Sequence, residues 1–248
     1  MRFFIEIAYN GSAYHGWQKQ PKAVSVQEVL ENALTTALQI KTEVVGAGRT
    51  DTGVHASQFF AHFDAELPSD TAQFIFKLNT ILPPDIAVFR IFEVSSEAHA
   101  RFDAISREYH YFVSIRKNPF KTGSAYYIKK KIDLQRMNEA AEILMKHTNF
   151  KAFSKVKTEV KTFDCKIESA VWEQIGDQLI FKIKADRFLR NMVRAIVGTL
   201  LDIGTHKTEV EDMQKIILGR NRCNAGKSVP AHALFLVNIE YPATITKQ

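Results

Sequence analysis

The strongest constraint on the fold is a succession of strand and helix patterns that occurs twice along this chain of 248 residues. Strands are indicated where apolar and polar residues alternate, and helices where apolar residues recur every three or four positions. In the first half these patterns give strand, helix, strand, strand, helix and strand. Their expected ranges are 3–9, 26–40, 43–48, 57–64, 71–82 and 86–94, in that order.

The second half gives the same order, with one shorter helix added before its last strand. The expected ranges are 106–116 for a strand, 134–145 for a helix, 163–175 and 178–185 for two strands, 188–203 and 208–219 for two helices, and 234–241 for a strand. Two β-α-β-β-α-β sets predict an α+β protein with two ferredoxin-like halves, each an antiparallel sheet with helices on one face. We place the boundary in the segment 96–105, so the predicted domains are 1–105 and 106–248. A site is expected in the central cleft between the halves.

Several positions set the expected ends and faces of the helices. Ser25–Glu28 and Thr208–Glu211 have the spacing of capping boxes, and Asp133 is expected to cap the helix that follows it. In the helix over 71–82, Ile81 is expected to face the core together with the other apolar residues at helical spacing.

The composition indicates a soluble globular protein with a basic surface. Hydrophobic residues make up 46% of the chain, and 33 Lys and Arg against 27 Asp and Glu give a formal net charge of +6. This excess of positive charge suggests a polyanionic partner. No apolar run is long enough to cross a membrane, and Glu6 interrupts the apolar N-terminal residues, so we expect a cytoplasmic protein.

Metal and disulfide patterns are absent from the sequence. Cys165 and Cys223 lie far apart without a Cys-x-x-Cys pair, and the eight histidines are scattered. We therefore expect no metal site and no disulfide framework, and no motif indicates a cofactor.

The stretch 46–56 is the candidate active-site loop, because three glycines there surround Arg49 and Asp51 between two predicted strands. Glycine permits tight turns, and an arginine two residues from a carboxylate helps to keep that carboxylate ionised and oriented. An ionised carboxylate can act as a nucleophile or a base. The alternative is purely structural, since Thr50–Gly53 is also good turn chemistry. No Gly-Lys-Ser/Thr follows to make a phosphate loop.

The full undecapeptide, Gly-Ala-Gly-Arg-Thr-Asp-Thr-Gly-Val-His-Ala, resembles the signature loop of the tRNA pseudouridine synthase A family. Further stretches resemble other motifs of that family: 106–111 its Arg-x-Tyr-x-Tyr strand, 188–194 its Phe-Leu-x-x-Met-Val-Arg helix, and 10–18 and 230–237 its flanking motifs. The similarity runs from about the first strand to about the last.

The resemblance implies isomerisation of uridine to pseudouridine at positions 38–40 of the tRNA anticodon stem-loop, with Asp51 as the catalytic residue. It also implies a homodimer that binds tRNA. Such an isomerisation needs no cofactor, in agreement with the absence of cofactor motifs. The target base must be flipped out of its stack to be reached. The sequence leaves open whether Asp51 forms a covalent adduct or the reaction passes through a glycal-type intermediate.

The resemblance also assigns substrate-binding roles in the second half. Tyr109 matches the family's site tyrosine, a candidate for base stacking and for proton handling at C5, with Tyr111 supporting it from the core. Without the resemblance, both would be ordinary strand residues. Arg194 is implied to pair with the catalytic aspartate, and Leu234 to line the uracil pocket. Phe188 and Met192 belong to the same helix motif and are assigned to the substrate site with it.

Basic residues supply candidate RNA contacts. Arg49 is expected to assist base flipping or to hold a neighbouring phosphate. Arg187, Arg190 and Arg194 have the spacing of one stripe on the helix expected over 188–203, which makes Arg187 and Arg190 candidate phosphate contacts. Lys155 and Lys157 are further candidates within a series of lysines over 151–161, and 129–131 is a run of three lysines. Taken alone, each of these lysines is more often solvated surface than an RNA contact, and a solvated face is the usual meaning of an arginine stripe.

Ala233 departs from the family pattern, which usually has glycine before the leucine of the uracil pocket. Alanine is tolerated there only if φ is negative.

Two other functions compete with the isomerase. Tandem four-stranded sheets are also the layout of RNA-recognition modules, but the sequence lacks their aromatic strand motif. Glycoside hydrolysis normally needs a second facing carboxylate, and the sequence offers no second acid in comparable surroundings.

Overall fold

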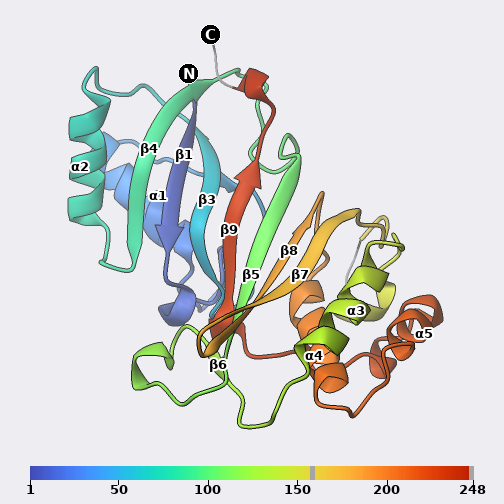
Figure 1. Cartoon of the computed structure of the whole chain (residues 1–248). Coiled ribbons are helices and arrows are strands. Elements are labelled where there is room, and N and C mark those ends of the chain that lie inside the picture. Colours follow the sequence, from blue (N-terminus) through green and yellow to red (C-terminus); the bar gives the residue numbers. More distant parts are fainter. Residues whose placement is uncertain (157–159, 246–248) are drawn as a thin grey trace. The chain divides into compact units, whose positions relative to one another are not determined.

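The computed structural model describes residues 1–156 and 160–245, and it mixes helices with multi-stranded sheet as predicted (Figure 1). The backbone forms two compact units, one made of Met1–Ile105 with Leu236–Gln248 and the other of Ser106–Phe235. The predicted domains 1–105 and 106–248 differ from these units in the placement of the C-terminal segment. The two units are described separately below.

The first unit contains β1 (Arg2–Tyr9), α1 (Val26–Leu38), β2 (Val45–Gly46), β3 (His55–Asp64), α2 (Thr71–Ile81) and β4 (Ile86–Val94). Its strands are antiparallel in the order β4-β1-β3, with β2 added to β3, and Figure 1 shows β1 between its two partners. Ile5 at the centre of β1 lies opposite Ala61 and Ile91 and is fully buried. The element order is the one predicted from the sequence.

Helix ends in this unit follow local side-chain and backbone chemistry. The Ser25 hydroxyl accepts a hydrogen bond from the Glu28 amide at 3.3 Å, so the Ser25 half of the first capping box is confirmed. Helix α1 ends at Leu38, earlier than predicted, because Gln39 adopts the left-handed conformation with φ of 59°. Ile81 is 38% exposed at the last turn of α2, so its expected inward orientation is wrong.

The C-terminal segment joins the first unit through β9 (Leu234–Glu240), which is hydrogen-bonded to β3, and through the Tyr241 side chain. The Tyr241 ring contacts Phe4 and Phe60 edge-on, at centroid distances of 5.2 and 5.3 Å. Its hydroxyl donates to the Ala100 carbonyl at 2.5 Å, and the Ile105 amide donates to the Glu240 carbonyl at 2.7 Å. These contacts join the C-terminal segment to residues that are far from it in the sequence. The alternation of apolar residues along a strand does not predict which distant residues the strand will contact.

His62 on β3 holds the same part of the unit by accepting a hydrogen bond at Nδ1 from the Ala100 amide, 3.1 Å away. Burial, with smaller contributions from nearby His99 and Arg2, lowers the pKa of His62 to about 4 from an ordinary value of 6.5. Between these values the unfolded chain binds a proton that the folded chain does not. The free energy of unfolding should therefore fall as the pH is lowered from about 6.5 to about 4, by on the order of 2 kcal/mol.

Denaturant titrations across this pH range test the prediction. His62→Asn keeps an acceptor close to the Nδ1 position but cannot titrate, so it should remove this part of the pH dependence. An unchanged slope in the variant would show that other groups cause the acid loss of stability.

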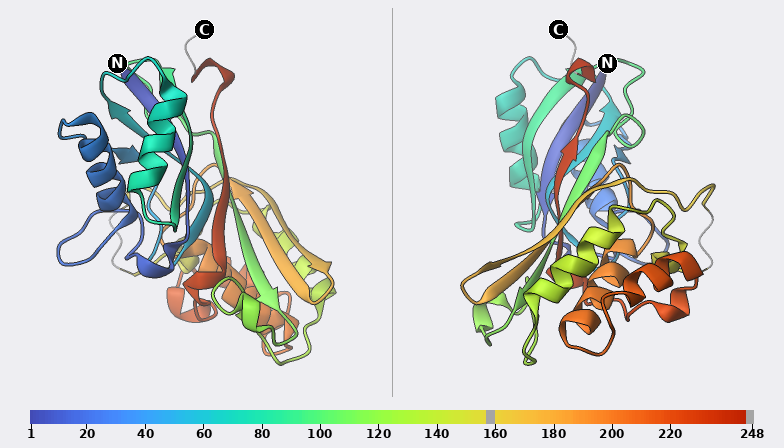
Figure 2. Two further views of the ribbon diagram at one scale, coloured as in Figure 1. Left: turned by 90° about the vertical axis from the view of Figure 1, so that its left-hand side faces the viewer. Right: turned by 45° about the vertical axis from the view of Figure 1, so that its right-hand side comes forward.

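The second unit contains β5 (Ser106–Ser114), β6 (Tyr126–Tyr127), α3 (Leu134–Leu144), β7 (Ile167–Ile175), β8 (Gln178–Ala185), α4 (Met192–Gly204), α5 (Asp212–Gly219) and the first residues of β9 (Leu234–Glu240). Strands β5, β8 and β7 are antiparallel neighbours in that order, and β6 pairs with β5 in parallel. Helix α3 packs against α4, α5 and β7, and Figure 2 shows the three helices gathered together.

Two helix starts in this unit differ from the predictions. Helix α4 begins at Met192 and not at Phe188, because Asn191 before it has a positive φ of 66°. Helix α5 begins at Asp212, and Thr208 does not cap it. Instead the Asp212 carboxylate accepts from the Glu209 amide at 3.2 Å, so the second capping box is wrong. Asp133 does cap α3, accepting from the Arg136 amide at 3.2 Å.

Candidate active site

The candidate active-site loop connects β2 to β3 in the first unit, and its end forms a tight turn. The Val54 amide donates to the Asp51 carbonyl at 3.1 Å, which closes a turn over residues 51–54. Asp51 is half-buried at the start of this turn, and Arg49 is exposed two residues before it. The turn chemistry therefore fixes the Asp51 backbone through main-chain bonds that do not use its carboxylate.

Residues 10–17 brace this loop through a hydrogen bond and close backbone contacts. The Tyr14 carbonyl accepts from the Gly53 amide at 3.3 Å. Gly11 and Gly16 lie directly against loop carbonyls: a Cβ at Gly11 would be 2.0 Å from the Val54 oxygen, and one at Gly16 would be 2.2 Å from the Thr50 oxygen. Gly16 also has a φ of +86°, which side-chain-bearing residues rarely adopt. The segment thus requires glycine where it meets the loop on both sides of Asp51.

Buried side chains complete the brace. The Tyr9 hydroxyl hydrogen-bonds the Thr50 hydroxyl at 2.9 Å, next to Asp51 in the sequence. The His55 Nδ1 accepts from the Gly11 amide at 3.1 Å, and His55 is buried. The Tyr14 hydroxyl donates to the Asp85 carboxylate at 2.5 Å, and burial together with this bond raises the Tyr14 pKa. Tyr14 therefore stays protonated and holds its position.

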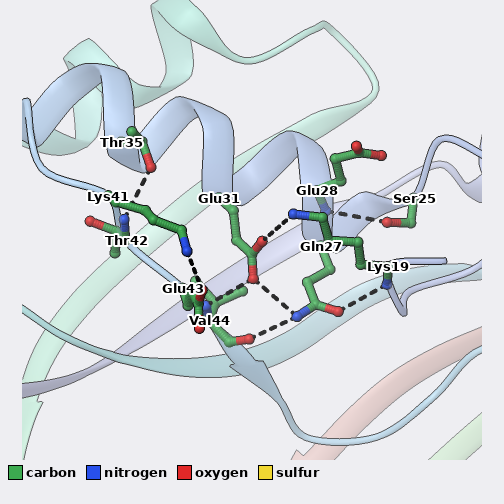
Figure 3. Close-up of polar contacts among 10 residues, drawn as sticks. All are labelled: Lys19, Ser25, Gln27, Glu28, Glu31, Thr35, Lys41, Thr42, Glu43 and Val44. Carbon is green, nitrogen blue, oxygen red and sulfur yellow. Dashed lines mark hydrogen bonds and ion pairs between the residues drawn. The ribbon is translucent and has the colours of Figure 1, made fainter. Parts of the chain in front are cut away.

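A clamp on α1 holds the segment that leads into the loop (Figure 3). The Glu31 carboxylate accepts from the Val44 amide at 3.2 Å, while the Gln27 amide group donates to the Val44 carbonyl at 3.0 Å. Gln27 also donates to Glu31 at 3.0 Å and accepts from the Lys19 backbone amide at 3.0 Å. Both backbone groups of Val44 are thereby satisfied just before β2, which fixes where the loop begins.

In the second unit the structure brings Tyr109 and Phe188 together. Tyr109 lies on β5 opposite Ile183 of β8, and its ring meets Phe188 edge-on, with centroids 5.2 Å apart and planes at 88°. Both side chains are half-buried. Tyr111 on the same strand is fully buried, as expected for a supporting residue, and its hydroxyl donates to the Pro230 carbonyl at 3.0 Å. Burial raises the Tyr111 pKa, so this phenol remains a donor.

Arg194 in the first turn of α4 anchors the segment before β9. Its Nε donates to the Val229 carbonyl at 2.8 Å, and the Val229 amide donates to the Arg194 carbonyl at 3.2 Å. The Asn191 side chain adds a bond to the Ser228 hydroxyl at 2.6 Å. This clasp positions the backbone that leads to Leu234, which is nearly fully buried.

Within residues 1–156 and 160–245, no group of three or more His, Cys, Asp or Glu side chains is arranged to hold a metal ion. No helix within the same ranges has the length and apolar character needed to span a membrane.

Comparison with known protein families matches residues 6–103 and 140–242 to the family described as tRNA pseudouridine synthase. The match covers most of the chain, including the braced loop and Arg194. The chain belongs to this family. It is 53% identical to tRNA pseudouridine synthase A of Bacteroides fragilis over 246 residues, which are 98% of each chain. It is also 49% identical to the Porphyromonas gingivalis protein of that name, over 98% of each chain, and 38% identical to that of Bacillus subtilis, over 97% of this chain and 99% of the relative.

Members of the tRNA pseudouridine synthase family isomerise uridine to pseudouridine in tRNA, so the protein is an isomerase. Phe188, Met192 and Arg194 do not share one helix in this synthase as the motif suggested. Phe188 precedes α4, Met192 is its first residue and is fully buried, and Arg194 lies in its first turn.

The predicted arginine stripe of this pseudouridine synthase is wrong, because Arg187 and Arg190 precede α4. The Arg187 amide donates to the Asp186 carboxylate at 2.7 Å, and the exposed Arg190 accepts at its carbonyl from the Lys155 amide at 3.1 Å. Lys155 is exposed, and Lys157 lies outside the described residues. That RNA is contacted by Arg187, Arg190, Lys155 and Lys157 stays a prediction.

Ala233 fits the synthase without backbone strain. It is not among the described residues with positive φ, and it lies fully buried at the end of a short 3-10 turn, Ala231–Ala233. The alanine is therefore compatible with the strand that follows.

Sequence reasoning gave no role to Tyr14 and His55, which brace the loop. The only available signal was their position inside stretches that resemble family motifs.

Proposed function

We propose that this pseudouridine synthase acts on uridines at positions 38–40 of the tRNA anticodon stem-loop, with Asp51 as its catalytic residue. The observation that carries the proposal is the placement of Asp51: half-buried, at the first position of a turn braced on both sides by residues 10–17. A carboxylate held on a fixed backbone can meet a bound nucleoside without reordering the loop.

The reaction exchanges one bond to the sugar for another. The bond from C1′ to N1 breaks, the uracil turns, and a bond from C1′ to C5 forms, while C5 loses its proton to solvent and N1 gains one. Asp51 starts this sequence by attacking the sugar or the base, which gives a covalent adduct, or by removing a sugar proton, which gives a glycal-type intermediate. Both routes require an ionised carboxylate.

Tyr109 is the proposed base-stacking residue, which also handles the proton at C5. Its edge-on contact with Phe188 fixes the orientation of the phenol ring, and its half-buried position leaves part of the ring accessible. We further propose that Leu234 lines the uracil pocket, with Met192 supporting it from the core. Arg194 is proposed as the partner of the Asp51 carboxylate, the role that the family resemblance implies.

Base flipping costs a few kcal/mol, which contacts to the RNA backbone can offset. Arg49 is proposed to assist flipping, because it is exposed two residues from Asp51. Arg187, Arg190, Lys155 and Lys157 are proposed as phosphate contacts.

The finer architecture and the assembly also belong to this proposal. We propose two ferredoxin-like halves around a central cleft; the halves are supported by the element order in each half of the chain and by the strand orders β4-β1-β3 and β5-β8-β7. We propose a cytoplasmic homodimer. Sedimentation equilibrium of the free protein should then give twice the chain mass of 28.2 kDa. A mass of 28.2 kDa over the micromolar range would rule out the dimer.

Release of tritium tests the reaction. Unmodified tRNA transcripts labelled with tritium at uridine C5 should lose label to water when the enzyme is added. Transcripts with cytidine at positions 38–40 serve as the control and should retain it. Equal release from both transcripts would overturn the proposed positions, and no release from any tRNA would overturn the function.

A further inference from the structure

The loop that follows β5 displays a phenylalanine almost completely to solvent. Phe120 is 97% exposed, the highest value among the large hydrophobic residues that the structure describes. We call residues 115–125 the Phe120 loop. It is the green excursion between β5 and β6 in Figure 1 and lies within the second unit. A single exposed phenylalanine is common on protein surfaces. Phe120 differs from such residues in two ways: hydrogen bonds hold its backbone in a turn, and charged residues lie beside it.

The loop fixes the Phe120 backbone through its own hydrogen bonds. The Asn118 side chain accepts from the Phe120 amide at 3.0 Å, and the Lys121 amide donates to the Asn118 carbonyl at 3.2 Å. Pro119 opens the resulting 3-10 turn, Pro119–Lys121, and the Thr122 hydroxyl donates back to the Pro119 carbonyl at 2.8 Å. The aromatic ring is therefore presented on a structured turn.

The base of the loop is attached to neighbouring strands. The Ile115 amide donates to the Asp177 carbonyl at 3.0 Å, which connects the loop to the turn between β7 and β8. The Ser114 hydroxyl donates to the Arg116 carbonyl at 2.5 Å. At the other end β6, which follows the loop, pairs with β5, so a ligand contact at Phe120 would need little reordering of the chain.

Positively charged side chains line the same hollow as Phe120. The hollow lies open to solvent between the loop and the β7–β8 turn, has a volume of about 320 Å³, and is lined by Arg116, Lys117, Phe120, Lys121 and four further residues. Asp177 is the one acidic residue of that lining, and it lies 3.5 Å from Arg116 in a solvent-exposed ion pair, which is weak. Three cations against one carboxylate around an aromatic ring favour a polyanion with stacking groups over an apolar protein surface.

We propose that the Phe120 loop is an RNA contact, in which an unpaired base of the tRNA stacks on Phe120 while Arg116, Lys117 and Lys121 contact adjacent phosphates. The proposal rests on the proposed function for its substrate. It assigns an RNA-binding role to a loop that neither Asp51 nor the other proposed site residues occupy.

Binding of unmodified tRNA to Phe120 variants tests the stacking. We expect Phe120→Ala and Phe120→Leu each to weaken binding about tenfold, and Phe120→Tyr to bind as the wild type does, because stacking needs a ring and not merely an apolar side chain. Phe76→Ala is the matched control, since Phe76 is 74% exposed on α2 of the other unit, and it should bind as the wild type does. Wild-type affinity of Phe120→Leu would overturn the stacking role.

A fluorescence measurement reports on the ring directly. Both native tryptophans, Trp17 and Trp172, are buried, so Phe120→Trp adds the one solvent-exposed indole of the described chain. We expect tRNA to quench this emission in a saturable way and to leave the emission of the wild type nearly unchanged. In addition, Lys117→Ala should lower the slope of log K against log salt concentration by about 0.7 to 0.9. An unquenched indole in the tRNA complex would contradict the proposal.

The outcome is separable from failure of the proposed function, because wild-type binding and tritium release are measured in the same preparations. If the wild type neither binds nor isomerises tRNA, the proposed function fails. If it does both, and Phe120→Ala binds tRNA as tightly, only the RNA contact fails. Dissociation of a wild-type dimer by Phe120→Ala with unchanged tRNA affinity would show that the loop contacts a second copy of this chain instead.

Discussion

Replacing Asp51 by asparagine should reduce tritium release from labelled tRNA by about 10⁴-fold or more, because the amide can neither attack the sugar nor take its proton. The variant should fold as the wild type does. The turn over residues 51–54 is closed by the Asp51 carbonyl, and the Tyr14 carbonyl holds Gly53, so neither bond uses the carboxylate. Binding of tRNA should also persist, since the change is nearly isosteric and the basic surface is intact.

A matched control separates loss of chemistry from loss of charge. Asp64→Asn removes a carboxylate at the end of β3, where the Arg2 guanidinium lowers its pKa by hydrogen bonding. It should retain tritium release while losing only the contribution of an exposed ion pair to stability. Activity of Asp51→Asn within tenfold of the wild type would disprove the catalytic assignment. Loss of its cooperative unfolding would instead favour the structural role of the turn.

Periodicity alone predicted the regular elements of the first unit. Strand β1, helix α2 and strand β4 lie within a residue of their predicted ranges, because each alternates or repeats its apolar residues between clear breaks. The same reasoning failed at the start of α4. The apolar spacing continues back to Phe188, but Asn191 takes a left-handed conformation and bonds the Ser228 hydroxyl across 37 residues. The local apolar spacing gives no indication of this bond, because Ser228 lies far away in the sequence.

The candidate site divides in the same way. Motif resemblance names Asp51 and Tyr109 as candidates, and their roles stay predictions, since a motif depends only on residue types that are visible in the sequence. The supports were not predictable, because they join distant segments: Tyr9 to Thr50, His55 to Gly11, and Glu31 to Val44. The expected inward position of Ile81 failed for a related reason. The helical repeat of apolar residues shows which side chains can face the core. It does not show how far the neighbouring element extends along the helix, and so whether the last turn is covered.

The second large effect is expected at Gly16. A methyl group there would lie 2.2 Å from the Thr50 carbonyl oxygen and 3.2 Å from the Asp51 carbonyl carbon, on a backbone with φ of +86°. Strain and overlap together should lower the free energy of unfolding of Gly16→Ala by about 2–5 kcal/mol. Relief of the overlap moves the loop at Asp51, so tritium release by the folded variant should fall at least about 100-fold. Chemical denaturation and tritium release, both at 25 °C, measure the two effects.

Gly48→Ala is the control for this prediction because it makes the same substitution within the candidate active-site loop itself, at a position where a methyl group meets no overlap. A Cβ at Gly48 meets nothing within 4 Å, and its φ lies outside the left-handed region, so the free energy of unfolding should stay within about 0.5 kcal/mol of the wild type. Equal stability of the two variants would mean that residues 10–17 do not brace the loop. If Gly16→Ala is destabilised but isomerises tRNA at the wild-type rate, the brace contributes to folding alone, and the position of Asp51 does not depend on it.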